Sequence, residues 1–306
     1  MTQVSSRTKA APVQARGSLA PALLRTARPK QWVKNILVLA APGAAGILFE
    51  RDTVARTAIA FLAFCLAASG TYFLNDAMDR DADRLHPRKR FRPVAAGLVP
   101  VWLARVLAIL LMAVAVAVAT LATSELAIVV AIYVTMTISY SLWLKHLPIV
   151  DLAAVASGFV LRAIAGGVAA GVPLSQWFLM VASFGSLFIV AGKRHGETLD
   201  LGGSGSGHRA TLGIYSTTFL QFVRGVAAAV ALASYCLWAF EKADLGARPI
   251  WFELSIIPFV LAILAYALRV ERGDGGAPED IVLHDRTILW MGAIWTALFG
   301  LGVYGV

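Results

Sequence analysis

Nine stretches of about twenty mostly apolar residues divide this chain of 306 residues. Each is close to the ~20 residues that an α-helix needs to cross the hydrocarbon core of a bilayer. Hydrophobic residues make up 58% of the sequence, whereas a soluble domain typically holds ~45–50%. The sequence therefore excludes an ordinary soluble domain and predicts an all-α polytopic membrane protein.

The predicted transmembrane helices cover residues 31–49, 54–76, 100–121, 125–144, 148–170, 175–193, 217–240, 251–270 and 287–305. Glycines interrupt the apolar run of the last one. Residues 1–25 lack the apolar core of a signal peptide, and we interpret them as a disordered cytoplasmic tail before a single domain over 26–306. Cys65 and Cys236 lie inside predicted spans and offer neither a disulfide framework nor a zinc site.

The basic residues predict the orientation in the membrane. With a cytoplasmic N-terminus, most of the 27 Lys and Arg fall in cytoplasmic segments, and only Arg51, Arg56, Lys242 and Arg248 fall outside. We therefore expect a multi-pass protein of the plasma (inner) membrane with its charged site on the cytoplasmic side. The net charge of +9 reflects this bias together with anionic lipid headgroups, so it does not argue for a nucleic-acid partner.

An acidic motif, N-D-A-M-D-R-D-A-D at 75–83, follows the second predicted span. If the helix continues, Asp76, Asp79 and Asp83 fall within an arc of roughly 60°, with Asn75 at its edge. Carboxylates on one face repel one another unless a cation lies among them, and oxygen ligands favour Mg²⁺ on a phosphate-bearing substrate. The motif predicts a Mg²⁺ site made by these four residues. The alternative, solvation of a loop by ion pairs, is preferred for Asp81 and Arg84.

Further charged side chains lie near the predicted cytoplasmic ends of spans. A lipid phosphate and an anionic substrate group are equally good partners for Lys34, whereas Arg28 is interpreted as an interfacial residue. Lys145 could pair with Asp151 or reach a phosphate. The candidate substrate-binding residues are Lys34, Tyr72, Lys89, Arg92, Lys145, Arg162, Lys193, Arg194 and Glu197.

Two positions among these candidates stand out: Arg162 inside a span, and the end of the span before residue 197. A guanidinium inside a span costs at least ~2.5–3.5 kcal/mol, so Arg162 should line a polar cavity or form an interhelical ion pair. Lys193, Arg194 and Glu197 share an arc of roughly 100° on one helix. In contrast, the acids of the loop 271–286 are interpreted as solvated surface rather than as ligands of a sugar hydroxyl, and the Gly-rich segment 202–207 as part of a lid.

The N-D-x-x-D-x-x-x-D motif, at the end of the second of nine spans, resembles the first Asp-rich motif of the UbiA superfamily of intramembrane prenyltransferases. The resemblance implies a helical bundle around a central cavity capped by cytoplasmic loops. Members that prenylate aromatic acceptors usually carry a second motif, D-x-x-x-D, where this chain has K-R-x-x-E at 193–197. With R-P-x-Q-W-V-K-N at 28–35 and K-R-F-R-P at 89–93, the chain resembles a branch that transfers phosphoribosyl groups.

That branch implies a Mg²⁺-dependent glycosyltransferase for cell-wall arabinan precursors. It would move 5-phosphoribosyl from phosphoribosyl diphosphate to decaprenyl (polyprenyl) phosphate and release pyrophosphate, with Asp76, Asp79 and Asp83 at the catalytic centre. The expected partners are these two substrates and the lipid bilayer, and a homo-oligomer is compatible with the sequence. The alternatives are an aromatic prenyltransferase that uses a prenyl diphosphate, or a transporter of an anionic lipid with Arg162 at its midplane.

Overall fold

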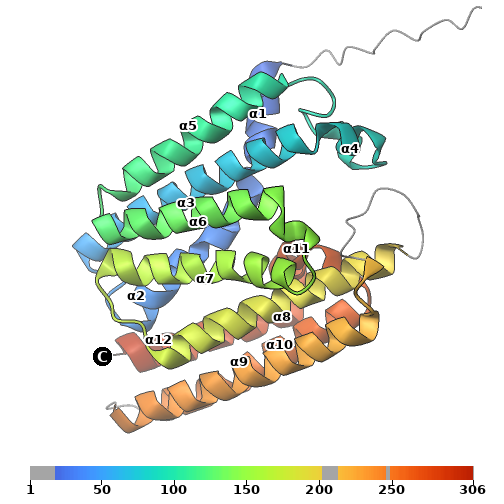
Figure 1. Cartoon of the computed structure of the whole chain (residues 1–306). Coiled ribbons are helices and arrows are strands. Elements are labelled where there is room, and N and C mark those ends of the chain that lie inside the picture. The colour runs from blue at the N-terminus through green and yellow to red at the C-terminus, as the bar shows by residue number, and fades with distance from the viewer. Residues whose placement is uncertain (1–17, 202–212, 246–248, 306) are drawn as a thin grey trace, which may run out of the picture.

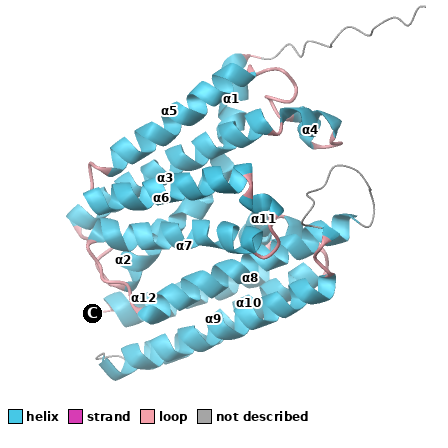
Figure 2. Cartoon of the chain, in the orientation of Figure 1, coloured by secondary structure: helices cyan, strands magenta, loops and turns pink. Residues whose placement is uncertain are grey.

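The computed structural model describes residues 18–201, 213–245 and 249–305, and this part of the chain is all helical (Figure 2). Eight of its helices are long and apolar enough to cross a membrane. They are α3 (Arg51–Met78), α5 (Val101–Ala119), α6 (Ser124–Leu142), α7 (Val150–Ala170), α8 (Gln176–Leu201), α9 (Thr217–Leu245), α10 (Pro249–Glu271) and α12 (Arg286–Tyr304). The prediction of a multi-pass membrane protein is confirmed, and the glycines of the last predicted span do not interrupt α12.

The first predicted span, 31–49, is not a single α-helix, and that prediction was wrong. The chain here forms the 3₁₀ helix η1 (Pro29–Leu39) and the short α2 (Ala40–Ala44). Pro42 lacks the N–H that a continuous helix needs. The side chain of Asn35 is fully buried and bonded to Cys65 of α3 and Arg162 of α7, so this segment also carries polar contacts to its neighbours.

This segment nevertheless runs along the length of α3. Arg28, just before η1, bonds Asp76 near the end of α3, and the Trp32 indole donates to Ser69 Oγ at 3.1 Å. Asn35 donates to Cys65 Sγ at 3.2 Å, one more step back along α3. The order of these pairs shows that η1 is antiparallel to α3.

A helix also begins earlier than we expected. Helix α1 (Leu19–Ala27) begins within the predicted tail of residues 1–25 and ends just beyond it, and residues 1–17 of the tail are outside the described residues. It packs on α3 through the buried Ala22, whereas Leu24 is 61% exposed. An amphipathic helix of this kind is stabilised by packing of one face, which a composition argument for residues 1–25 does not detect.

The long helices lie side by side in two groups (Figure 1). Helix α3 packs on α5, α6 and α7, and α9 packs on α8 and α10, with α12 against α10. Helices α7 and α8 join the groups. A close approach holds η1 against α7, because a Cβ at Gly166 would stand 1.8 Å from the Val38 carbonyl oxygen. Only glycine permits this contact.

Short elements gather at the end of the bundle where α3 and α8 finish: α4 (Arg80–Leu85), η2 (Lys89–Phe91), η3 (Leu144–His146), η5 (Asp274–Gly276) and α11 (Pro278–His284). Figure 1 shows α4 and α11 at this end. A Cβ at Gly196 would lie 2.4 Å from the Gly276 amide nitrogen, so glycine lets η5 sit directly on α8. This places α11 over the ends of η1 and α8. The Gly-rich segment 202–207 is outside the described residues.

Candidate active site

The acidic motif lies at a bend between two helices. Helix α3 ends at Met78, Asp79 has φ −87° and ψ 6°, and α4 begins at Arg80. The Asp79 amide still donates to the Asn75 carbonyl and the Asp83 amide to the Asp79 carbonyl, both at 2.8 Å. The backbone therefore keeps helical spacing across the bend, which leaves Asp76 and Asp83 near one another.

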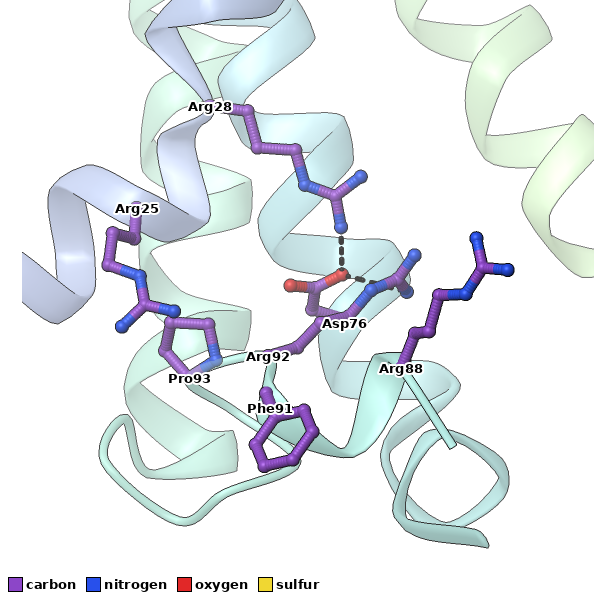
Figure 3. A pocket seen from close by; sticks show the side chains of 7 residues that line it. All are labelled: Arg25, Arg28, Asp76, Arg88, Phe91, Arg92 and Pro93. Atoms are coloured by element: carbon purple, nitrogen blue, oxygen red, sulfur yellow. Dashed lines mark hydrogen bonds and ion pairs between the residues drawn. The ribbon is translucent and has the colours of Figure 1, made fainter. Parts of the chain in front are cut away.

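Arginines neutralise the two buried acids of the motif, Asp76 and Asp83. Figure 3 shows Asp76 with its partners Arg28 and Arg92. Asp76 is 1% exposed, and its Oδ1 accepts from Arg28 Nη2 at 2.6 Å and from Arg92 Nη1 at 3.3 Å. The same Nη1 of Arg92 donates to Asp83 Oδ2 at 2.7 Å. One guanidinium nitrogen therefore bridges two carboxylates.

The third acid faces a different cation. Asp79 lies 3.2 Å from Lys145 Nζ, which η3 brings across from the end of α6. Asn75 is half-buried and takes part through its backbone carbonyl. We left open whether Lys145 pairs with Asp151 or reaches a phosphate. The acid with which it pairs in the structure is Asp79.

Arg28 is not the interfacial residue that we predicted. Its φ of 54° and ψ of 60° lie in the left-handed region, where a non-glycine residue costs about 1–3 kcal/mol. The ion pair with Asp76 holds it there, as does the Tyr72 ring, whose centroid is 4.7 Å from the guanidinium carbon. The strained turn between α1 and η1 aims this arginine at the acidic motif.

A second group of charges lies between η1, α8 and α11. Glu279 Oε1 accepts from the Gln31 amide at 2.8 Å, and its Oε2 lies 3.6 Å from Lys34 Nζ. Burial alone would raise the pKa of Glu279, but the Gln31 hydrogen bond and the charges of Lys34 and Lys193 outweigh it, so this pKa is lowered. Lys34 also interacts electrostatically with Arg162. Two candidate cations, Lys34 and Lys193, thus lie around one carboxylate.

Sequence reasoning missed Glu279, because we interpreted the acids of its loop as solvated surface. Its side chain is only 20% exposed, and its partner Gln31 is 248 positions away in the chain. The one local signal was the proline before it, which begins α11. That signal predicts a helix start and says nothing about what the helix covers.

Arg162 on α7 is 7% exposed and is bonded by neutral groups. It donates to Asn35 Oδ1 at 2.7 Å, the Gly158 carbonyl at 2.6 Å and the Tyr133 hydroxyl at 2.9 Å. Among the described residues no acid forms an ion pair with it. These contacts join α6, α7 and η1 and so support a packing role. The cavity-lining role that we favoured for Arg162 stays a prediction.

The charges at the end of α8 form a closed network. Arg194 is 3% exposed and donates to Asp151 at 3.2 Å, to Glu197 at 2.6 Å and to the Tyr140 hydroxyl at 3.0 Å. The Tyr215 hydroxyl donates to Asp151, which is fully buried. Arg194 and Glu197 therefore do share a face, but they contact each other and protein neighbours. Lys193, one position earlier, lies near enough to Lys34 and Glu279 to interact with them electrostatically.

Residues 36–290 match the model of the UbiA prenyltransferase family. The chain belongs to this family. It is 45% identical to a decaprenyl-phosphate phosphoribosyltransferase of Corynebacterium glutamicum, over 94% of this chain and 88% of that one. It is 44% identical to a protein of the same name from Mycobacterium tuberculosis, over 94% and 95% of the two chains.

Solved structures of the family share the fold. A UbiA homolog from Archaeoglobus fulgidus, bound to GPP and Mg²⁺, superposes with a TM-score of 0.71 at 18% identity, over 93% of this chain and all of that one. The eight long helices of the present chain are therefore arranged as in a UbiA-like bundle.

The donor chemistry of the acidic motif suits Mg²⁺, which prefers carboxylate and carbonyl oxygens. Asp76 and Asp83 bracket one positively charged nitrogen, Arg92 Nη1, as two ligands would bracket a metal. Within the described residues, however, no group of three or more His, Cys, Asp or Glu side chains is gathered closely enough to hold a metal ion. The bend at Asp79 explains this, because it directs the third carboxylate to Lys145.

The candidate substrate-binding residues thus fall into three sets. Arg92, Lys145 and Tyr72 adjoin the acidic motif or its arginines. Lys89, at the start of η2, is also beside the motif and belongs to this first set. Lys34 and Lys193 form the second set, around Glu279. Arg162, Arg194 and Glu197 bond protein neighbours.

Proposed function

We propose that this protein transfers the 5-phosphoribosyl group of phosphoribosyl diphosphate to decaprenyl phosphate and releases pyrophosphate. The observation that carries the proposal is the identity of 44–45% along nearly the whole chain to proteins named for that activity. The charge pattern supports it, since two anionic substrates need more cations than one, and basic residues stand where other family members have a second acidic motif.

We place this reaction at the cytoplasmic face of the plasma membrane, at the end of the bundle where α3 and α8 finish and the short elements gather. The proposal includes a ninth crossing by residues 29–44. Eleven residues of 3₁₀ helix at ~2.0 Å each and five of α-helix at ~1.5 Å give about 30 Å, the thickness of the hydrocarbon core. A crossing there makes α3 end on the same side as the N-terminus.

In this proposal, Asn75, Asp76, Asp79 and Asp83 hold Mg²⁺ on the diphosphate of the donor. When bound, the metal would withdraw negative charge from the departing pyrophosphate. Arg92 and Lys145, which contact the same carboxylates, bind phosphate oxygens of the donor.

Transfer requires two bond changes at C1 of the ribose. The bond from C1 to the pyrophosphate oxygen breaks, and a phosphate oxygen of the acceptor forms the new bond from the opposite face. A phosphate monoester is largely ionised at neutral pH, so the nucleophile needs no general base from the protein. Lys34 and Lys193 position this anionic nucleophile, because they lie on η1 and α8 where the apolar tail of the acceptor can pass between helices into lipid.

Glu279 completes the site as an acceptor for the sugar. Its Oε2 is buried and has no hydrogen-bond partner among the described residues, although Lys34 is 3.6 Å away. A buried carboxylate oxygen without a donor is costly, and a ribose hydroxyl would satisfy it. Glu279 therefore orients the donor while Lys34 meets the phosphate.

Pyrophosphate release tests the proposal. Purified protein with Mg²⁺ and phosphoribosyl diphosphate should release pyrophosphate only when decaprenyl phosphate is added, and Asp79→Ala should abolish the release. If prenyl diphosphates are consumed with an aromatic acid instead, the phosphoribosyl assignment is wrong and family membership alone stands.

A further inference from the structure

A pocket of about 300 Å³ lies on the α1 side of the acidic motif (Figure 3). The residues that line it are Arg25, Arg28, Asp76, Arg88, Phe91, Arg92 and Pro93. They come from α1, the turn into η1, the end of α3 and the loop around η2. Neither Arg25 nor Arg88 was a sequence candidate, because each lies in a run where a basic residue is expected from the positive-inside bias alone.

The pocket carries an excess of positive charge. Asp76 is the one acid in its lining, and it contacts Arg28 and Arg92 through a single oxygen. Arg25 and Arg88 are exposed, and neither has an ion-pair partner within the described parts of the chain. Even if Asp83 is counted as a second acid through Arg92, the four guanidinium groups exceed the acids by two.

Four guanidinium groups that line one pocket repel each other, and an anion among them offsets this repulsion. A phosphate monoester carries about −1.5 to −2 charges at neutral pH and offers three acceptor oxygens. Each arginine can meet two of these oxygens with its planar fork. Phe91 and Pro93 add an apolar wall. Because Asp76 is the one acid in the lining, the pocket is suited to an anion rather than to a cation.

We propose that Arg25 and Arg88, with Arg28 and Arg92, bind a phosphate monoester next to the acidic motif. Which monoester this is rests on the proposed function, in which each substrate carries one: the 5-phosphate of the donor and the phosphate of the prenyl acceptor. Because Arg28 and Arg92 already contact Asp76, the bound phosphate would lie directly beside the diphosphate site. The pocket therefore adds a second anion subsite to the one at the metal.

Binding to the full-length protein in phosphatidylcholine nanodiscs tests the pocket without any turnover. The probes are ribose 5-phosphate and farnesyl phosphate, with ribose and farnesol as their phosphate-free counterparts. The variant is Arg25→Gln with Arg88→Gln. The matched control is Arg51→Gln with Arg56→Gln, which removes two exposed arginines from the opposite end of α3. The thermal unfolding midpoint of each variant reports folding.

We expect the Arg25 and Arg88 variant to bind at least one phosphate probe tenfold or more weakly, with an unchanged midpoint and an unchanged control variant. Loss for ribose 5-phosphate assigns the pocket to the donor, loss for farnesyl phosphate assigns it to the acceptor, and loss for both shows that it selects the monoester itself. Unchanged binding of both phosphates, an equal loss for ribose or farnesol, or an equal loss in the control variant overturns the proposal.

Failure of the pocket and failure of the proposed function give different results. If the wild-type protein binds a phosphate probe through Arg25 and Arg88 but releases no pyrophosphate from phosphoribosyl diphosphate, the proposed function fails and the pocket stands. If it releases pyrophosphate and the variant binds both probes as the wild type does, the function stands and the pocket proposal is wrong.

Discussion

The ends of α3 and α8 both gather charge on the same side of the bundle, but they use it differently. At the end of α3 the arginines outnumber the acids, and exposed Arg25 and Arg88 border an open pocket. At the end of α8 the buried Arg194 is surrounded by Asp151, Glu197 and Tyr140, and Tyr215 closes the network. The arginines at the end of α3 can therefore bind an anionic ligand, whereas Arg194 at the end of α8 has its hydrogen bonds made by protein groups.

A charged cluster at a helix end has a different role when its charges balance and when one sign is in excess. Buried ion pairs whose hydrogen bonds are all made within the protein hold elements together, and breaking one leaves an uncompensated charge. A cluster with a surplus of one sign must be compensated from outside. We therefore expect substitutions at the end of α3 to change activity and substitutions in the Arg194 network at the end of α8 to change stability.

The largest effect should come from Asp76→Asn. Asp76 is almost fully buried at the centre of the proposed metal and phosphate sites. Its loss should lower kcat by roughly 10²–10³, the range seen when one group that stabilises transition-state charge is removed. The measurement is initial rate of pyrophosphate release at saturating substrates. Asp52→Asn, an exposed acid at the start of the same helix, is the control and should retain full activity.

At the end of α8, Asp151→Asn should cost about 3 kcal/mol of unfolding free energy, because it breaks a buried pair with Arg194. Tyr215→Phe removes the hydrogen bond that this hydroxyl donates to the same carboxylate and the one that it accepts from the Ile149 amide, so it should cost about 2 kcal/mol. Thermal unfolding in detergent gives both values. The KM values of the protein that remains folded should not change. A tenfold rise in KM at an unchanged midpoint would contradict the division between the two ends.

Arg162→Lys tests whether the buried arginine inside the bundle acts in packing or in substrate binding. Lysine keeps the charge but cannot reach Asn35, Gly158 and Tyr133 together as the guanidinium does, so we expect a loss of about 2 kcal/mol in stability. The KM of both substrates should stay within twofold. An unchanged midpoint with a large rise in either KM would restore the substrate-binding role that the sequence predicts.

The smallest effect concerns Glu279→Gln, which should raise the KM for phosphoribosyl diphosphate about tenfold through the loss of one charge-assisted hydrogen bond. Asp280→Asn, the exposed neighbouring acid, is the matched control. The pKa of Glu279 is lowered despite burial, by Gln31, Lys34 and Lys193, so its charge is present above its unfolded pKa and lost only as pH falls through the lowered one. The donor KM should therefore show no titration of Glu279 between about pH 6 and 8. An Asp280 variant that matches Glu279→Gln would count against this role.

The sequence was enough to locate eight spanning helices, because each is a continuous apolar run bounded by charged or turn-forming residues. It failed at residues 31–49 for a physical reason. Hydropathy counts Asn35 and the prolines as minor interruptions, whereas in the fold Asn35 bonds both Cys65 and Arg162, and Gly166 admits the backbone of η1. Apolar content predicted a crossing but could not predict which helix type makes it.

The acidic motif was predictable from spacing, but its partners were not. Arg28 is 48 positions from Asp76, and Gln31 is 248 positions from Glu279. No local sequence pattern indicates a contact between residues that are so far apart in the chain. The bend at Asp79 was equally hidden, since nothing in the residues around it breaks a helix as proline would. Site residues that depend on a single helix could be predicted, whereas those brought together by α1, η1 and α11 could not.

The identity of the lipid product tests the central claim most directly. Protein in detergent should be given Mg²⁺, decaprenyl phosphate and phosphoribosyl diphosphate labelled in the ribose, and the lipid fraction analysed by mass spectrometry. We expect labelled decaprenyl phosphate that has gained one 5-phosphoribosyl group, formed at equal rates by the wild type and by Asp52→Asn and roughly a hundredfold or more slowly by Asp76→Asn. Label that stays in the aqueous fraction while the protein is folded, or equal product from Asp76→Asn, would contradict it.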